Sequence, residues 1–270
     1  MLIQYLYVAF KYIMMHDDSL RIVSLVPSIT ELLYHLELSN EVVGITKFCV
    51  HPNDWFKTKT RIGGTKNIHI ENIRSLAPTL VIANKEENVK EQVEALEAFT
   101  KVHLTDVSNF EDALKMIQDI GVLTNSQSKA AEIVKTIQDS FADLCELCSK
   151  QQLQSIPCTY LIWQDPYMTI GGDTYINDLL TKIGFSNVFA KSERYPSISL
   201  SDIDQTNCKV IFLSSEPYPF KQMHIEILQK YFPDKLILLA DGEMFSWYGS
   251  RLLEAPAYFK SLIQRVAKEL

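Results

Sequence analysis

Short apolar runs alternate with segments of helical periodicity along the first part of the chain. Buried strands are predicted at runs of β-branched and aliphatic residues, namely 22–26, 41–46, 79–84 and 102–104. Helices are predicted where apolar residues recur every three or four positions, at 70–76, 89–99 and 110–120. Gly121 is expected to end the last of these helices. The alternation is typical of a parallel sheet with helices on both faces.

The pattern changes between residues 122 and 156, where the chain has no glycine and no proline. Apolar residues there form a single stripe at helical spacing: Ala130, Val134, Ile137, Phe141, Leu144 and Cys148. One long helix is predicted, and about 25 residues of it would span roughly 37 Å. The alternation resumes after Pro157, with strands predicted at 158–163, 210–213 and 236–240. Helices are predicted at 174–183, 220–231 and 252–270.

These elements predict an α/β protein in which two α/β lobes with parallel-type sheets are joined by one long rigid helix. The expected parts are an N-terminal extension (1–20), an N-terminal lobe (21–121), a connecting helix (122–156) and a C-terminal lobe (157–270). A helical joint favours small hinge motion over wide closure.

The charge balance argues against a nucleic-acid partner. The 270 residues carry a formal net charge of -7, and lysine and arginine do not cluster. The five cysteines are odd in number and widely spaced, which argues against a disulfide framework. Cys145 and Cys148 form C-x-x-C inside the long helical pattern, and a second ligand pair at zinc spacing is missing. We therefore favour two small apolar residues on a helix face over a metal or redox role.

The first fifteen residues, "MLIQYLYVAFKYIMM", are apolar but do not have the layout of a secretory signal. They are too short to span a bilayer and are interrupted by Lys11. Their positive charge comes late, and no small-residue cleavage site follows. Three interpretations stay open: a poor signal, an extension upstream of a start at Met14 or Met15, or an added packed element.

A strand is followed at once by a helix in "RIVSLVPSITELLYHL", residues 21–36. Pro27 has no N–H for a strand ladder, and Ser28 with Glu31 reads S-x-x-E, the signature of a capping box. A helix N-terminus at the carboxyl end of a strand is where open α/β sheets bind ligands and where anionic groups are favoured. Ser28 is therefore expected to face a ligand at the rim of a cleft between the lobes.

Three stretches resemble the class III periplasmic binding proteins. They are residues 21–46, residues 62–88 and "GGDTYINDLLTKIGFSNVF" at 171–189. The most specific part is E-x-I-x-x-L-x-P-x-L-V-I at 71–82, in which Thr79 stands where the family usually has Asp. The resemblance covers about 21–270, and the pattern is most similar to the cobalamin-binding members. The family's two-lobe fold with a long connecting helix agrees with the reading from periodicity.

The resemblance implies a substrate-binding protein of an ABC importer, not an enzyme. It would bind a corrinoid (cobalamin) or an iron chelate, such as haem or an iron–siderophore, in the cleft between two lobes. That ligand would be transported cargo, and no intrinsic cofactor is implied. The implied partner is an ABC permease, and a monomer is expected. The resemblance implies a periplasmic location, whereas the N-terminus leaves a cytoplasmic one open.

A cleft for a large, flat, partly apolar chelate needs aromatic walls and polar donors. Candidates in the first lobe are Ser28, Phe48, His51, Gly64, Thr65, Lys66 and Asn84. Candidates in the second lobe are Trp163, Tyr167, Asp173, Tyr195, Trp247, Tyr248 and Arg251. Because neighbouring residues point in different directions, Trp247 and Tyr248 are not both expected in the core.

Two of these candidates carry a qualification. His51 could reach a metal together with Cys49, but a loop histidine before Pro52 is the favoured interpretation, so no metal site is predicted. Asn84 stands where a cobalamin binder is expected to have a large aromatic residue.

The resemblance also implies that one carboxylate on each lobe docks to arginines of the permease. Glu216, in "SSEPYPF", matches the position in the second lobe. Glu86 is the candidate in the first lobe, where Lys90 occupies the position expected for the family glutamate. Glu87 and Glu91 are interpreted as part of a solvated acidic loop.

Two alternatives belong to other functional classes. One is a cytoplasmic enzyme or chaperone that handles a tetrapyrrole or metal on the same fold. The other is a binding module that has lost its ligand and serves as a partner surface. Against an enzyme, Ser28 lies in P-S-x-T-E rather than G-x-S-x-G, and the chain has no phosphate loop and no H-E-x-x-H.

Overall fold

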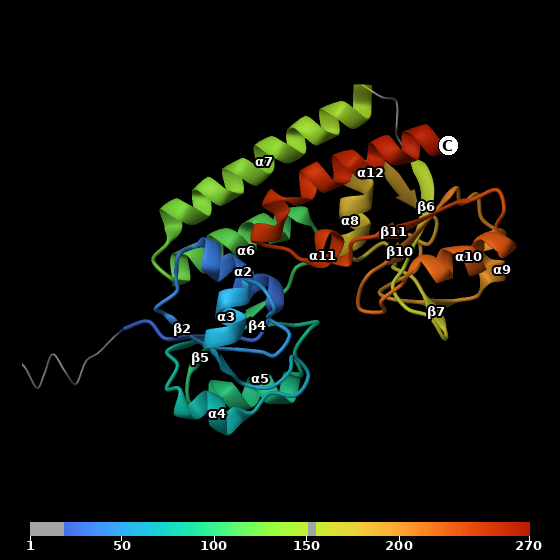
Figure 1. Cartoon of the computed structure of the whole chain (residues 1–270). Coiled ribbons are helices and arrows are strands. Elements are labelled where there is room, and N and C mark those ends of the chain that lie inside the picture. Colours follow the sequence, from blue (N-terminus) through green and yellow to red (C-terminus); the bar gives the residue numbers. More distant parts are fainter. Residues whose placement is uncertain (1–18, 151–154) are drawn as a thin grey trace, which may run out of the picture. The chain divides into compact units, whose positions relative to one another are not determined.

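The computed structural model describes residues 19–150 and 155–270, which form two compact units (Figure 1). Unit 1 contains the described residues up to Val26 and residues 37–104, and unit 2 contains residues 27–36 and 105–270. Helix α2 (Pro27–His35) therefore belongs to unit 2, although it directly follows the first strand. This division differs from the one expected from the sequence, in which the N-terminal lobe runs over 21–121 and a connecting helix follows at 122–156.

Unit 1 is built on a five-stranded sheet in the order β3-β2-β1-β4-β5. Its strands are β1 (Ile22–Ser24), β2 (Val42–Ile45), β3 (Thr60–Arg61), β4 (Leu80–Asn84) and β5 (Lys101–Thr105). Strand β1 pairs in parallel with β2 and β4, and β2 pairs in parallel with β3. Every residue of β1 and β4 is buried, which explains their unbroken apolar runs. The helices of this unit are α3 (Asn53–Thr58), α4 (Ile70–Ser75) and α5 (Lys90–Glu97).

Unit 2 is built on a four-stranded parallel sheet in the order β11-β10-β6-β8. Its strands are β6 (Ile156–Leu161), β8 (Phe185–Asn187), β10 (Val210–Ser214) and β11 (Leu236–Ala240). A small antiparallel pair is formed by β7 (Tyr167–Met168) and β9 (Ser197–Ile198). The shorter helices are α8 (Tyr175–Lys182), α9 (Leu200–Asp204), α10 (Gln222–Tyr231), α11 (Gly242–Ser246) and the 3-10 turn η1 (Ser250–Leu253). The last helix is α12 (Ala255–Glu269).

Strand β10 shows how both faces of this sheet are covered. Ile211 and Leu213 join an apolar cluster with residues of α9 and α10. Phe212 points to the other face, where its ring lies 6.2 Å from that of Phe245 in α11. The Phe245 ring in turn lies 4.8 Å from Phe259 of α12. Alternate residues of one strand therefore serve two cores, as in a sheet between helical layers.

The long helix is present, but its start differs from the prediction. Helix α6 (Phe110–Leu123) continues past Gly121, and α7 runs over Gln127–Lys150. A Cβ atom at Gly121 would lie 2.5 Å from the Cβ of Ala130, so this glycine allows α6 and α7 to approach closely. Gly121 is therefore a packing residue, and the prediction that it ends a helix is wrong.

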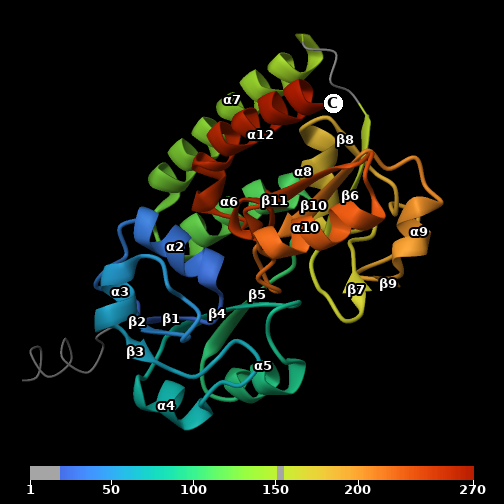
Figure 2. The same ribbon diagram turned by 45° about the vertical axis from the view of Figure 1, so that its right-hand side comes forward.

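Helix α7 lies along α12 within unit 2 (Figures 1 and 2). The Phe141 ring lies 4.6 Å from Phe110 of α6 and 6.2 Å from Phe259 of α12. The predicted apolar stripe is confirmed, because all six of its residues are buried. The helix that joins the two sheets in the sequence is thus held by neighbours on more than one side.

Two parts of the prediction lie outside the described residues: positions 1–18 of the expected extension, with the apolar segment that begins the chain, and positions 151–154 of the expected helix. In the part of the chain that the structure does describe, no helix combines the length and the apolar character needed to cross a membrane.

Candidate functional site

Three loops meet at the carboxyl-terminal edge of the unit 1 sheet, after β2, β3 and β4. The backbone N–H of Lys47 donates to the Gly63 carbonyl at 2.8 Å, which joins the first two loops. The Asn88 side chain donates to the Thr65 carbonyl at 2.9 Å, and the Lys66 ammonium donates to the Glu86 carbonyl. We call this surface the unit 1 edge; its predicted site residues are Phe48, His51, Gly64, Thr65, Lys66, Asn84 and Glu86.

Phe48 is the aromatic side chain that the unit 1 edge presents to solvent. It is 51% exposed, and the Lys47 ammonium lies 5.1 Å from the centre of its ring. A Cβ atom at Gly64 would come within 3.1 Å of this ring, so the glycine lets the ring lie against the backbone. The edge therefore offers a flat apolar surface with a cationic rim.

Cys49 and His51 have different environments in the same loop. Cys49 is fully buried, with its sulfur 3.1 Å from Thr46 Oγ1, whereas His51 is half-buried. Among the residues that the structure describes, no three His, Cys, Asp or Glu side chains gather closely enough to hold a metal ion.

Asn84 is a buried residue that holds the loop after β4 at the unit 1 edge. It is 2% exposed, and its side-chain oxygen accepts hydrogen bonds from the N–H groups of Glu86 (2.8 Å) and Glu87 (3.2 Å). Its own N–H donates to Asn88 Oδ1 at 2.8 Å. The side chain thus folds the loop that follows β4, a common role of asparagine at turns.

An aromatic group lies at the carboxyl-terminal edge of the unit 2 sheet, after β6 and β10. Trp163 is 40% exposed, and its ring packs edge-on against Tyr218 at 5.6 Å. The Tyr218 hydroxyl lies 3.1 Å from Gln164 Oε1 and 3.3 Å from His224 Nε2. His224 Nδ1 accepts the N–H of Lys221 at 2.8 Å, which fixes the ring beside Tyr218. We call this surface the unit 2 edge.

Trp247, which was predicted to line a cleft, is a buried side chain in the structure. It is 8% exposed, and its indole N–H donates to Glu216 Oε1 at 3.1 Å. The same oxygen accepts the Ser246 hydroxyl at 2.7 Å. The Glu216 carboxylate is therefore engaged by two side-chain donors from the segment that follows β11.

Burial raises the pKa of the Glu216 carboxyl above its usual value. The hydrogen bonds from Ser246 and Trp247 oppose this rise, and the neighbouring carboxylates of Glu243 and Asp241 add to it. The ionised carboxylate therefore costs stability at neutral pH. That cost disappears as the pH falls through the raised pKa toward the ordinary value of about 4.3.

We accordingly expect Glu216→Gln to be at least as stable as the wild type at pH 7.5, because the amide oxygen still accepts both donors. The advantage should shrink as the pH is lowered to about 4.5. Thermal melts of both proteins across this range measure it, with the exposed Glu226→Gln as the matched control. A variant that is less stable at pH 7.5 and equal at pH 4.5 would show that the charge is favourable instead.

Arg251 lies in a buried ion-pair cluster. It is 8% exposed, and its guanidinium lies 2.6 Å from Glu31 Oε1 and 3.3 Å from Glu243 Oε2. The exposed Glu254 adds a third carboxylate at 3.5 Å, and the Trp247 ring lies 5.2 Å away. This arrangement binds α2 to η1, so Arg251 is a residue that holds unit 2 together.

The predicted capping box is wrong. Ser28 is the second residue of α2 rather than the residue before it, and Glu31 is engaged by Arg251. Ser28 is 3% exposed, and its hydroxyl has no hydrogen-bond partner in the described part of the chain. Pro27 begins the helix, a position where its missing N–H costs nothing. Ser28 is thus a buried residue of α2, and its role toward a ligand stays a prediction.

Trp247 and Tyr248 are both buried, so the expectation that at most one of them packs in the core is wrong. Tyr248 is 7% exposed, and its ring packs edge-on against Tyr175 at 5.9 Å. The two side chains do point in different directions, but each direction leads to a packed environment of unit 2.

The three other predicted residues lie around the β7–β9 pair. Tyr167 belongs to β7 and is half-buried against the apolar cluster of α9 and α10. Asp173 is exposed, and its carboxylate accepts the N–H of Arg194 at 2.6 Å. The Arg194 guanidinium lies 5.7 Å from the ring of Tyr195. Asp173 and Tyr195 thus flank one loop contact.

Sequence reasoning missed the partners that complete the unit 2 edge, namely Gln164, Tyr218 and His224. Tyr218 stands two residues after Glu216, in a loop that was read only for its carboxylate. The signal available was the density of aromatic residues in "EPYPF", directly after a buried strand.

Comparison with known proteins gives a family match over most of the chain. Residues 22–238 match the family described as "Periplasmic binding protein". An uncharacterised ABC transporter substrate-binding lipoprotein of Bacillus subtilis is 31% identical over 178 residues, which are 63% of this chain and 55% of that relative. The chain therefore spans little more than half the length of this relative. A vitamin B12-binding protein of Vibrio parahaemolyticus is 24% identical over 72% of this chain and 70% of the relative.

A solved structure has the same fold at lower sequence identity. A periplasmic heme-binding protein of Roseiflexus sp. RS-1, in its apo form, superposes with a TM-score of 0.80 at 19% identity. The match covers 92% of this chain and 99% of the solved one. It supports the two-sheet α/β fold with a long helix between the sheets in the sequence.

Proposed function

Because the chain belongs to the periplasmic binding protein family, we propose that it captures a metal chelate and delivers it to an ABC importer. The ligand would be a corrinoid or an iron chelate such as haem. The chain is a binding protein rather than an enzyme, and the alternative of an enzyme on this fold receives no support from its relatives. The lipoprotein and periplasmic relatives support a place outside the cytoplasm.

The observation that carries the proposal is an exposed aromatic side chain at the carboxyl-terminal edge of each sheet. Phe48 is 51% exposed on the unit 1 edge, and Trp163 is 40% exposed on the unit 2 edge. Large apolar rings are costly to leave in water, and strand ends of α/β sheets are the usual binding positions. Relatives that bind vitamin B12 and heme support a flat, partly apolar ligand.

Titration with cyanocobalamin, haemin and a ferric siderophore tests the proposal, with tryptophan fluorescence as the signal. Trp163 is the exposed tryptophan, since Trp55 and Trp247 are 4% and 8% exposed. We expect saturable quenching by one of the three ligands. Phe48→Ser should lower the affinity for that ligand by about tenfold or more, because burying a phenylalanine ring is worth roughly 1.5–3 kcal/mol.

Tyr231→Ser is the matched control. Tyr231 is 64% exposed on α10, and its loss should leave the affinity unchanged. Quenching by none of the three ligands would contradict the proposed function. Saturable binding that Phe48→Ser leaves unaltered would contradict the role of the unit 1 edge.

The docking role proposed for Glu86 and Glu216 rests on the family resemblance. Glu86 is half-buried in the loop after β4. Glu216 Oε1 already accepts two side-chain donors, so docking through this residue would use its other oxygen or would release Trp247.

A further inference from the structure

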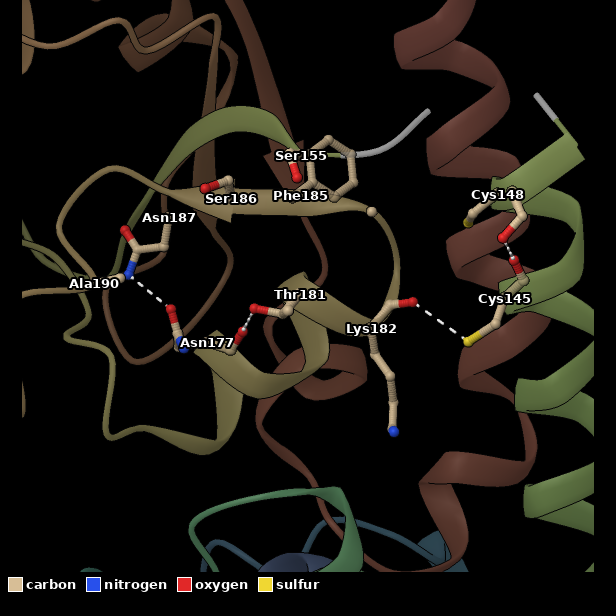
Figure 3. A pocket seen from close by; sticks show the side chains of 12 residues that line it. Cys145, Cys148, Ser155, Asn177, Thr181, Lys182, Phe185, Ser186, Asn187 and Ala190 are labelled. Atoms are coloured by element: carbon tan, nitrogen blue, oxygen red, sulfur yellow. Dashed lines mark hydrogen bonds between the residues drawn. The ribbon is translucent and has the colours of Figure 1, made fainter. Parts of the chain in front are cut away.

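The C-x-x-C pair of α7 lies at a pocket of unit 2 that shares no lining residue with the unit 2 edge. The pocket has a volume of about 380 Å³ and lies between the end of α7, the end of α8 and strand β8 (Figure 3). Cys145 is half-exposed and Cys148 is buried, and both line the pocket. Solvent access through Cys145 distinguishes this pair from cysteines sealed in the core.

The two sulfur atoms converge on one point of the fold. Cys145 Sγ lies 3.5 Å from the Lys182 carbonyl, and Cys148 Sγ lies 3.6 Å from the Ile183 carbonyl. These carbonyls are consecutive in the chain, at the end of α8. Two thiols one helical turn apart therefore face the same small region, which Figure 3 shows for the Cys145 sulfur and the Lys182 carbonyl.

The rest of the described lining offers no negatively charged side chain to a cation. Hydroxyl and amide side chains line the pocket, and none of its described lining residues is a carboxylate. The Lys182 ammonium lies 4.6 Å from the Phe110 ring, so its charge is held by that ring. Zinc normally takes four protein ligands, and no group of three His, Cys, Asp or Glu side chains is found in the described chain.

The spacing of the pair disfavours a disulfide, a usual role of C-x-x-C. Cβ atoms three residues apart on a helix are about 5–6 Å apart, whereas a disulfide needs about 3.5–4.5 Å. Two unbonded thiols whose sulfurs face consecutive carbonyls suit an ion that accepts two soft ligands.

We propose that Cys145 and Cys148 form a binding site for one soft monovalent cation of the Cu(I) class. Thiolates select Cu(I), which two sulfur ligands can satisfy. One Cu(I) ion forms two Cu–S bonds, two S–H bonds break, and both protons go to solvent. No electron is transferred, and the bound unit carries one negative charge. The proposal is independent of the chelate bound at the sheet edges.

The test uses the full-length, reduced protein under anaerobic conditions, with Cu(I) supplied as its bathocuproine disulfonate complex. We expect the wild type to withdraw one equivalent of Cu(I) from this chelator. Cys145→Ser and Cys148→Ser should each weaken binding roughly 100-fold or more, because a single thiolate remains. Serine keeps a hydrogen-bond donor to the same carbonyl, and thermal melts check that both variants fold.

Cys208→Ser is the matched control. Cys208 is a buried thiol of the same unit, 4% exposed, whose sulfur donates to the Val210 carbonyl at 3.2 Å. This variant should bind Cu(I) like the wild type. The proposal would be overturned if no Cu(I) passed from the chelator to the wild type, or if Cys145→Ser or Cys148→Ser bound Cu(I) as tightly as the wild type. Loss of binding in Cys208→Ser would overturn it too. A Cys145–Cys148 disulfide, seen as a 2 Da mass loss once the reductant is removed, would overturn it as well.

Discussion

Arg251→Met is expected to destabilise unit 2 by about 3–5 kcal/mol, because it removes the cation from a buried cluster of carboxylates. Glu31, 7% exposed, would lose the guanidinium that now lies 2.6 Å away. Methionine retains much of the apolar stem, so lost packing makes a smaller contribution. Urea unfolding of the full chain at neutral pH measures the difference.

Arg265→Met is the matched control for this experiment. Arg265 pairs with Glu269 at 2.8 Å on the surface of α12, and both side chains are substantially exposed. Exposed pairs contribute about 0–1 kcal/mol, so the control should unfold close to the wild type. Adding Glu31→Gln to Arg251→Met should recover part of the loss. Equal stability of the two arginine variants would show that the cluster does not hold α2.

Gly172→Ala is expected to cost about 3 kcal/mol or more, at the upper end of overpacking substitutions. A Cβ atom at Gly172 would lie 2.1 Å from the Ala190 carbonyl oxygen, and the Gly172 N–H donates to the Ser192 carbonyl at 2.9 Å. The obstacle is backbone that is itself hydrogen-bonded, so it cannot yield as a side chain would. Chemical unfolding monitored by circular dichroism tests the expectation.

Gly64→Ala is the matched control, because it makes the same substitution at a position where the neighbouring atoms belong to side chains that can move. Its Cβ atom would meet the Phe48 ring at 3.1 Å and Lys47 Cε at 3.3 Å, both on exposed side chains. We expect a loss below about 1 kcal/mol. If Gly172→Ala were as mild as this control, the close approach between residues 172 and 190 would be contradicted.

The sequence predicted the elements whose signal is local. Strands β4 and β10 are unbroken apolar runs, and the stripe of α7 follows helical spacing over six residues, so both could be read from periodicity alone. Elements such as α3 and β7 were not foreseen, because six residues or fewer carry too little periodicity.

The site was harder to predict, because its members acquire their roles from residues far away in the chain. Ser28 and Glu31 fit a capping box locally, but Arg251 competes for the carboxylate from 220 positions away. Trp247 was predicted from the sequence to line a cleft, which gave no sign that its indole N–H donates to Glu216, 31 positions earlier. The exposed rings of Phe48 and Trp163, by contrast, lie directly after strands and were among the predicted residues.

The long separation between Glu31 and Arg251 in the sequence sets an order of events during synthesis and folding. At about 5–20 residues per second, roughly 10–40 s pass on the ribosome between the synthesis of α2 and that of its anchor. Until then α2 has been made but lacks the Arg251 guanidinium, so unit 2 completes its folding only after most of its chain has emerged. A polypeptide that stalls before residue 251 therefore exposes an unanchored amphipathic helix, which chaperones and proteases can recognise.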